Sequence, residues 1–113
     1  MKTFKNYAAQ GDMMLIRIDA LPDDAKEAVA TNGQFILTHS ETGHHHVVLE
    51  RPTVKFFSAM DEFRSYLVVE NEPAVLEHLR PTDTHESLEI PVGIFEVRRQ
   101  REYSPAGWQR AAD

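Results

Sequence analysis

The amino-acid sequence predicts an all-β domain: a small antiparallel β-barrel or β-sandwich of six to eight strands, with one short helix. Short runs rich in β-branched and aromatic residues recur at residues 34–39, 53–57, 65–70 and 94–101. Turn-forming Gly, Pro, Asn and Asp residues separate these runs. Short strands at this spacing, with a turn signal between neighbours, are typical of sandwiches and barrels.

The chain length indicates one domain. It has 113 residues, of which 42% are hydrophobic, and this is enough for an ordinary core. We expect a single domain over residues 1–113, in which residues 1–10 form an N-terminal arm or a first short strand. Residues 104–113 are expected to form a frayed C-terminal tail.

A strand is predicted after the turn at Gly11-Asp12. Within residues 13–19, Met14, Ile16 and Ile18 alternate with Arg17 and Asp19, which predicts that the three apolar residues face the core.

The short helix is predicted at residues 24–30. Asp24 and Glu27 have the spacing of a capping box, and Asn32-Gly33 is a helix-ending signal.

Two hairpins are predicted next. Residues 34–39 and 44–50 form the first, and residues 65–70 and 74–78 form the second, followed by pairing of 76–78 with 85–90. The residues predicted to be buried are Ile16, Phe35, Leu37, Phe56, Leu67, Val69, Leu76, Phe95 and Val97.

Composition excludes several classes of site. The chain has no cysteine, so disulfides, cysteine-bound metals and thiol nucleophiles are ruled out. No signal-peptide-like or membrane-spanning apolar run is present, which predicts a cytoplasmic protein without a membrane partner. The formal net charge of −6 argues against general nucleic-acid binding. No organic cofactor is indicated, the partners stay unknown, and a homo-oligomer stays open.

The clearest chemical signal is the run His44-His45-His46 after Gly43. Because successive strand residues face opposite sides, His44 and His46 share one face with Val48 and Glu50, while His45 lies on the other. An even hairpin loop would place His39 opposite His44 and Leu37 opposite His46. A three-residue loop would oppose His39 to His45 and separate the histidines.

Two further histidines, His78 and His85, flank the link that follows the second hairpin. If the hairpins pack together, the predicted metal ligands are His44, His46, His39, His78 and His85. Imidazole suits transition metals, so zinc, nickel, manganese or iron is expected, with one coordination position open to water.

Two alternatives to metal binding remain. A pair such as His44 and His78 could act as general base and acid without metal, with Arg98, Arg99 and Arg101 holding an anionic or phosphate-bearing substrate. Alternatively, the histidines are surface residues of a structural or interaction protein, and the arginines are solvated strand charges. The sequence does not decide whether the protein is an enzyme.

Several of these features together resemble a group of small uncharacterised bacterial and phage-borne proteins. The residues that carry the resemblance are Gly11-Asp12, the Gly43-His44-x-His46 element, His78, His85 and Arg99-Gln100-Arg101-Glu102-Tyr103. The likeness spans roughly residues 10–105. It implies a histidine site at these positions and no named function. This chain departs from the pattern in having a third histidine, His45, in the variable slot.

A weaker resemblance concerns His44-x-His46-x3-Glu50, which is similar to the core of the first cupin motif. That resemblance implies a metal held by these three residues inside a β-barrel. The usual flanking glycines are absent, because Gly43 adjoins His44 and no glycine follows Glu50 until Gly93. No second motif is evident, although His85 would be available as a remote fourth ligand.

Overall fold

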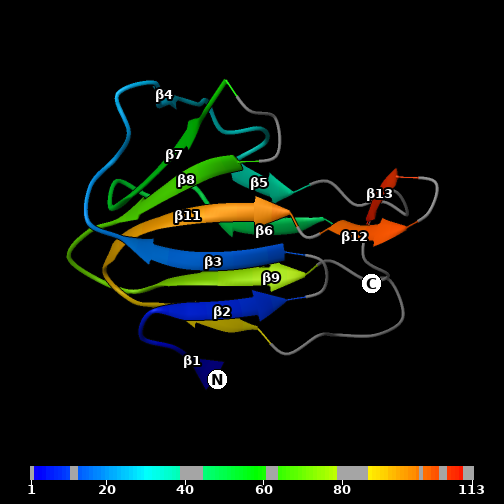
Figure 1. Cartoon of the computed structure of the whole chain (residues 1–113). Helices are drawn as coiled ribbons and strands as arrows, with labels where there is room; N and C mark the ends of the chain where they lie inside the picture. The colour runs from blue at the N-terminus through cyan, green and yellow to red at the C-terminus, as the bar shows by residue number, and fades with distance from the viewer. Residues whose placement is uncertain are drawn as a thin grey trace.

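The computed structural model shows two β-sheets packed against each other and a separate two-stranded hairpin beyond one end (Figure 1). The structure describes residues 2–10, 13–38, 45–60, 64–78, 87–99, 101–104 and 107–110, with the backbone alone for residue 78 and the last two ranges.

The five-stranded sheet has the order β1-β10-β9-β6-β5. Its strands are β1 (Lys2–Thr3), β10 (Leu88–Ile90), β9 (Ala74–His78), β6 (His46–Leu49) and β5 (Gln34–Thr38). The six-stranded sheet has the order β2-β3-β11-β8-β7-β4. Its strands are β2 (Tyr7–Gln10), β3 (Met13–Ile18), β11 (Gly93–Arg99), β8 (Arg64–Val69), β7 (Val54–Ser58) and β4 (Lys26–Glu27). The hairpin consists of β12 (Arg101–Ser104) and β13 (Gly107–Arg110).

The architecture is a β-sandwich and not a closed barrel, because the end strands of each sheet do not pair with each other. The all-β prediction is confirmed, and every strand pair is antiparallel except β1 with β10. The described residues form more strands than the predicted six to eight. Two-residue edge strands such as β1 and β4 are too short for alternation to reveal them in a sequence.

A single apolar cluster fills the space between the sheets. Seven of the nine residues predicted to be buried belong to it, and Phe56 packs against it while partly buried. The seven are Phe35, Leu37, Leu67, Val69, Leu76, Phe95 and Val97.

The prediction for the inward face of β3 was wrong. Met13 and Leu15 point into the core with no exposure, so Ile16 lies on the opposite face. Arg17 shares the inward face and lies 4.9 Å above the Phe95 ring. Its guanidinium also donates hydrogen bonds to two backbone carbonyls, one of them Val92 O at 3.0 Å. An arginine can close the end of a core in this way because its charge is hydrogen-bonded and its stem is apolar.

The predicted helix at residues 24–30 does not form. Lys26–Glu27 is the edge strand β4, which pairs with Phe57 and Ser58, and Ala28 N donates to Phe56 O at 2.8 Å. A helix of two turns is marginal in isolation, so pairing with a sheet edge is preferred.

Asn32-Gly33 is the two-residue turn of a hairpin and not a helix end. Both residues have positive φ, 51° and 76°, and Thr31 and Gln34 exchange backbone hydrogen bonds across them. This is the conformation of a type I′ turn, for which Asn-Gly is the favoured sequence.

Residues 65–70 and 74–78 do not pair as a hairpin. The first run lies in β8 of the six-stranded sheet, whereas β9 lies in the five-stranded sheet, so the chain crosses between sheets. Asn71, with φ of 68°, lies in the crossing segment. The crossing places β9 directly beside β6, the strand that carries His46.

Of the two predicted alternatives for the N-terminus, residues 2–10 contain short strands and do not form a separate arm. β1 joins the five-stranded sheet and β2 joins the six-stranded sheet, so the N-terminus spans both layers. Phe4, between them, contacts Phe95 edge-on with ring centroids 5.4 Å apart. At the other end of the chain, residues 107–110 of the predicted frayed tail form β13.

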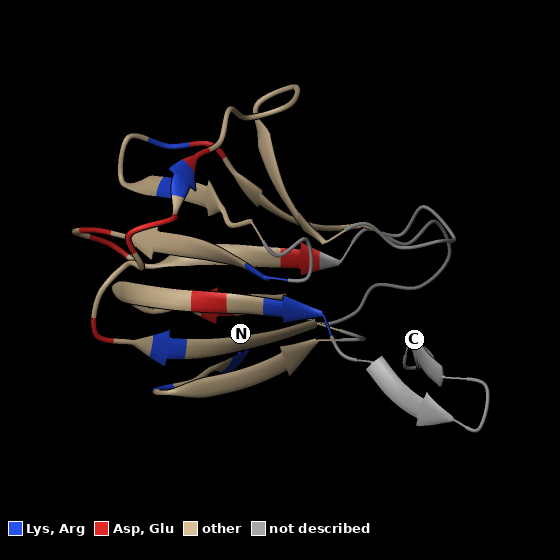
Figure 2. Cartoon of the chain, turned by 45° about the horizontal axis from the view of Figure 1, so that its top comes forward, with Lys and Arg blue, Asp and Glu red and all other residues tan. Residues whose placement is uncertain are grey.

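Acidic and basic positions are interspersed along the described strands and turns (Figure 2). None of the described residues lies in a helix long and apolar enough to cross a membrane. The cytoplasmic location stays a prediction.

Candidate metal centre

Two histidines of the described chain lie side by side at one end of the five-stranded sheet. His46 begins β6, His78 ends β9, and these two residues are direct partners in the antiparallel register. Directly paired residues of antiparallel strands have Cβ atoms only ~4.5–5.5 Å apart on the same face. The fold therefore brings two histidines that are distant in sequence to adjacent positions.

His46 is completely buried on the inner face of the sandwich. It shares that face with Val48, two positions along β6, which belongs to the core cluster. The predicted assignment of His46 and Val48 to one face is thus confirmed.

His46 also connects the two sheets. Its Nδ1 lies 2.8 Å from Oε1 of Gln10, a residue of β2 in the six-stranded sheet that is only 8% exposed. Because an amide oxygen can only accept, Nδ1 must carry the proton in this bond. In the neutral tautomer the ring lone pair is then on Nε2, the atom used for metal coordination or proton transfer.

The register of the first hairpin agrees with the even-loop prediction over its first part. Phe35 opposes Val48 and Ile36 opposes Val47, as that register requires. A register shift between Ile36 and Thr38 then places Thr38, and not Leu37, opposite His46. Thr38 is buried, and its hydroxyl has no hydrogen-bond partner among the described residues.

Of the other predicted ligands, only His78 lies in the described part of the chain, beside His46. His44, His39 and His85 lie outside the described residues, and His78 is described by its backbone alone. In sequence, His39 directly follows β5, His44 precedes β6 by two positions and His85 precedes β10 by three. Within the described part of the chain, no three His, Asp or Glu side chains form a group that could hold a metal.

Gln10 is the site residue that the sequence did not reveal. Its contact with His46 joins residues 36 positions apart on different sheets. No local pattern around Gln10 indicates such a contact, and its only sequence signal is its position just before the turn at Gly11-Asp12.

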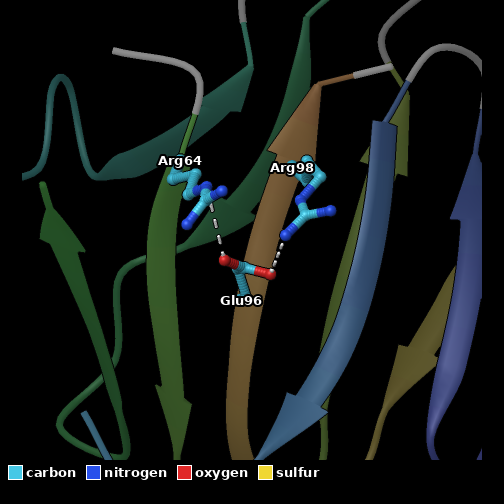
Figure 3. Close-up of polar contacts among 3 residues, drawn as sticks. All are labelled: Arg64, Glu96 and Arg98. Atoms are coloured by element: carbon cyan, nitrogen blue, oxygen red, sulfur yellow. Dashed lines mark hydrogen bonds and ion pairs between the residues drawn. The ribbon is translucent and has the colours of Figure 1, made fainter. Parts of the chain in front are cut away.

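The arginines at the end of β11 face different sides of the six-stranded sheet. Arg98 is on the outer face, where its guanidinium lies 3.0 Å from Oε2 of Glu96, while Arg64 lies 3.8 Å from Oε1 (Figure 3). Arg99 alternates with Arg98 and stands on the inner face, paired with Met13. The side chain of Arg101 is outside the description. Anion binding by these arginines stays a prediction.

Glu50, the third residue of the cupin-like pattern, is exposed and lies beyond the end of β6. Four residues of extended chain separate it from His46, which corresponds to ~13 Å. Glu50 is therefore at the far end of the sheet from His46.

Two hollows occur on the described surface. One of about 260 Å³ is lined by residues of β6 and β9, including Val75 and Glu77. The other, of about 530 Å³, lies over Phe35 and Val54 beside the β4 segment. Apart from Glu50 of the cupin-like pattern, which lines the second hollow, their lining residues include none of those predicted for the metal or anion sites, so the hollows do not support either hypothesis.

A family model described as a domain of unknown function, DUF8820, matches residues 9–100. The chain belongs to this family. The matched segment includes β3 to β11 and all six histidines, and it ends before the β12–β13 hairpin. No curated protein and no solved structure matches the chain significantly.

Proposed function

We propose that this domain binds a transition metal ion at the histidine end of the sandwich, with His46 and His78 as the central ligands. The observation that carries the proposal is the register pairing of His46 with His78, together with the Gln10 hydrogen bond that directs the His46 lone pair to Nε2. Metal-binding histidines commonly donate their other ring N–H to a carbonyl group in this way. The sequence supplies His39, His44 and His85 within three residues of the same strand ends.

The burial of His46 favours a closed coordination shell. Because its side chain has no solvent exposure, a metal on Nε2 would be separated from bulk water on the His46 side. Closed four-ligand sites are typical of structural zinc, whereas catalytic sites keep a position for water. We therefore infer a metal that holds the two sheets together, in place of the open site that the sequence suggested.

Untagged protein is expected to retain about one zinc, nickel, manganese or iron ion per chain, measured by elemental analysis after gel filtration. The double substitution His44→Ala with His46→Ala should remove the metal, because both residues are proposed ligands on one face. The control His45→Ala should retain it, since His45 precedes β6 out of phase with His46. Equal loss in the control, or wild-type protein that neither retains nor takes up any of these metals, would contradict the proposal.

A second candidate is an anion site at the same end, and the position of Arg99 favours it. The registers place Gln10, Met13 and Arg99 in one row across the inner face of the six-stranded sheet. A guanidinium near imidazoles is suited to a phosphate or carboxylate group of a substrate.

For this candidate, inorganic phosphate should raise the melting temperature of metal-free protein. The double substitution Arg99→Ala with Arg101→Ala should abolish that increase, because it removes both proposed anion ligands. Calorimetric titration with phosphate gives the second measurement, and Arg64→Ala on the outer face is the control. If phosphate raises the melting temperature of wild type and of the double variant equally, these arginines do not bind phosphate and are ordinary surface charges.

A further inference from the structure

The outer face of the six-stranded sheet is apolar where a solvent-facing sheet is normally polar. β3 shows this most clearly, because Met13 and Leu15 face the core while Met14, Ile16 and Ile18 face outward. Antiparallel strands with one solvent-exposed face usually alternate apolar and polar residues, whereas strands that are covered on both faces are apolar throughout. β3 therefore has the pattern of a strand with a partner on each side.

The neighbouring strands extend this surface across the sheet. Ile94 is paired with Ile18 on one side and with Val68 on the other, so three apolar side chains form one row. A second row begins with Tyr7, which is 55% exposed and paired with Ile16. We call these side chains, with Met14 and Phe57, the outer apolar face; Tyr66 lies on the same side of the sheet but is only 5% exposed. In Figure 1 no described segment crosses in front of it.

An ion cluster lies within the outer apolar face. Glu96 is paired with Ile16 and Tyr66, its side chain is only 12% exposed, and it accepts from Arg98 while lying near Arg64 (Figure 3). The surface thus presents both signs of charge next to apolar side chains. In a two-fold arrangement, the carboxylate of one copy can meet the arginines of the other.

We propose that two copies of this chain associate through the outer apolar face. A two-fold interface uses the same patch on both copies, so the patch must complement itself. Apolar rows and a cluster containing both charges satisfy this requirement, whereas a patch of one sign would select a different protein. The proposal is independent of the metal site, which lies on the inner side of the sandwich.

The size of the face indicates a weak dimer. Five strands at ~4.8 Å spacing and about six residues at ~3.4 Å rise give roughly 24 by 20 Å, or ~500 Å². Stable interfaces bury about 800 Å² on each partner, and smaller ones are typically transient. Association is therefore expected to depend on concentration.

The proposal is tested with Ile16→Lys in the full chain. Its cross-strand partner is Glu96, so the new ammonium has a counter-charge in the monomer but would be buried in the dimer. Sedimentation velocity and light scattering over about 1 to 500 µM should show wild type shifting from one to two chains, in the range of transient complexes. Ile16→Lys should weaken the dimer at least about tenfold, a factor that corresponds to ~1.4 kcal/mol.

Val75→Lys is the matched control, because Val75 is a partly buried residue on the outer face of the other sheet and is also paired with a glutamate, Glu89. It should dimerise like wild type, and circular dichroism should show that both variants are folded. Wild-type protein that stays monomeric over the whole concentration range, or that assembles beyond two chains, would overturn the proposal. Equal weakening of the dimer by Ile16→Lys and Val75→Lys would also overturn it.

Discussion

Replacing Phe95 with alanine is expected to lower the free energy of unfolding by about 3–5 kcal/mol, because a cavity remains in addition to the lost burial of the ring. Phe95 has no exposure and lies in β11, between β3 and β8. Its ring contacts Phe4 edge-on and lies beneath the Arg17 guanidinium, so its removal also withdraws packing from both residues. Domains of this size are stabilised by only about 5–15 kcal/mol, so the variant is expected to be close to unfolding at room temperature.

Urea denaturation followed by circular dichroism measures the effect, with Phe57→Ala as the control. Phe57 is a phenylalanine on the outer face that is only partly buried, so its replacement should cost less than half as much. Both variants should be compared at a few micromolar, where the proposed dimer does not contribute. Equal losses would show that Phe95 is not at the centre of the core.

The core was predictable where strands have one apolar face. Phe95 and Val97 alternate with polar Glu96 and Arg98, and Leu67 and Val69 follow the same rule in β8. In β3, alternation gave the wrong face because residues 13–16 are all apolar. The choice of face there depends on Arg17, whose guanidinium is accommodated inward by Phe95 and by backbone carbonyls from distant segments.

The edge elements were less predictable. The spacing of Asp24 and Glu27 is locally compatible with a helix, but the hydrogen bond of Ala28 to Phe56 joins segments about thirty residues apart. Propensity over seven residues is a small contribution, and tertiary pairing outweighs it. Asn32-Gly33 could have been recognised, because this pair between two extended runs is a strong hairpin signal.

The face of the sheet on which His46 lies was predictable, but its contacts with other segments were not. Strand alternation correctly placed His46 on the side of Val48. The register shift before Thr38 and the contact with Gln10 depend on how two hairpins and two sheets fit together. A sequence without such long-range information identifies the histidines but not the residue that orients one of them.

Replacing His46 with alanine is expected to destabilise even metal-free protein, by roughly 2–4 kcal/mol, because it leaves a cavity and a buried amide without its hydrogen bond. Gln10 is the residue that loses this hydrogen bond, and Gln10→Leu should show the cost of removing the same bond from the His46 side. The double variant should be less destabilised than the sum of the two single variants, because both polar partners of this hydrogen bond have then been removed. A double-mutant cycle in the presence of a chelator measures this coupling, which we expect at about 1–2 kcal/mol.

Zinc added to wild type, the two single variants and the double variant distinguishes a purely structural role of His46 from a role as metal ligand. Zinc at one hundred times its dissociation constant should stabilise wild type by about 2.7 kcal/mol, because the ion binds only the folded state. His46→Ala should lose this increment entirely. Gln10→Leu should bind zinc about 10–100-fold more weakly, because the imidazole is no longer held by its second nitrogen. Coupling in the chelator combined with no zinc increment in wild type would show that the hydrogen bond between His46 and Gln10 only ties the two sheets together. If the zinc increment is unchanged in His46→Ala, the metal is bound elsewhere in the chain.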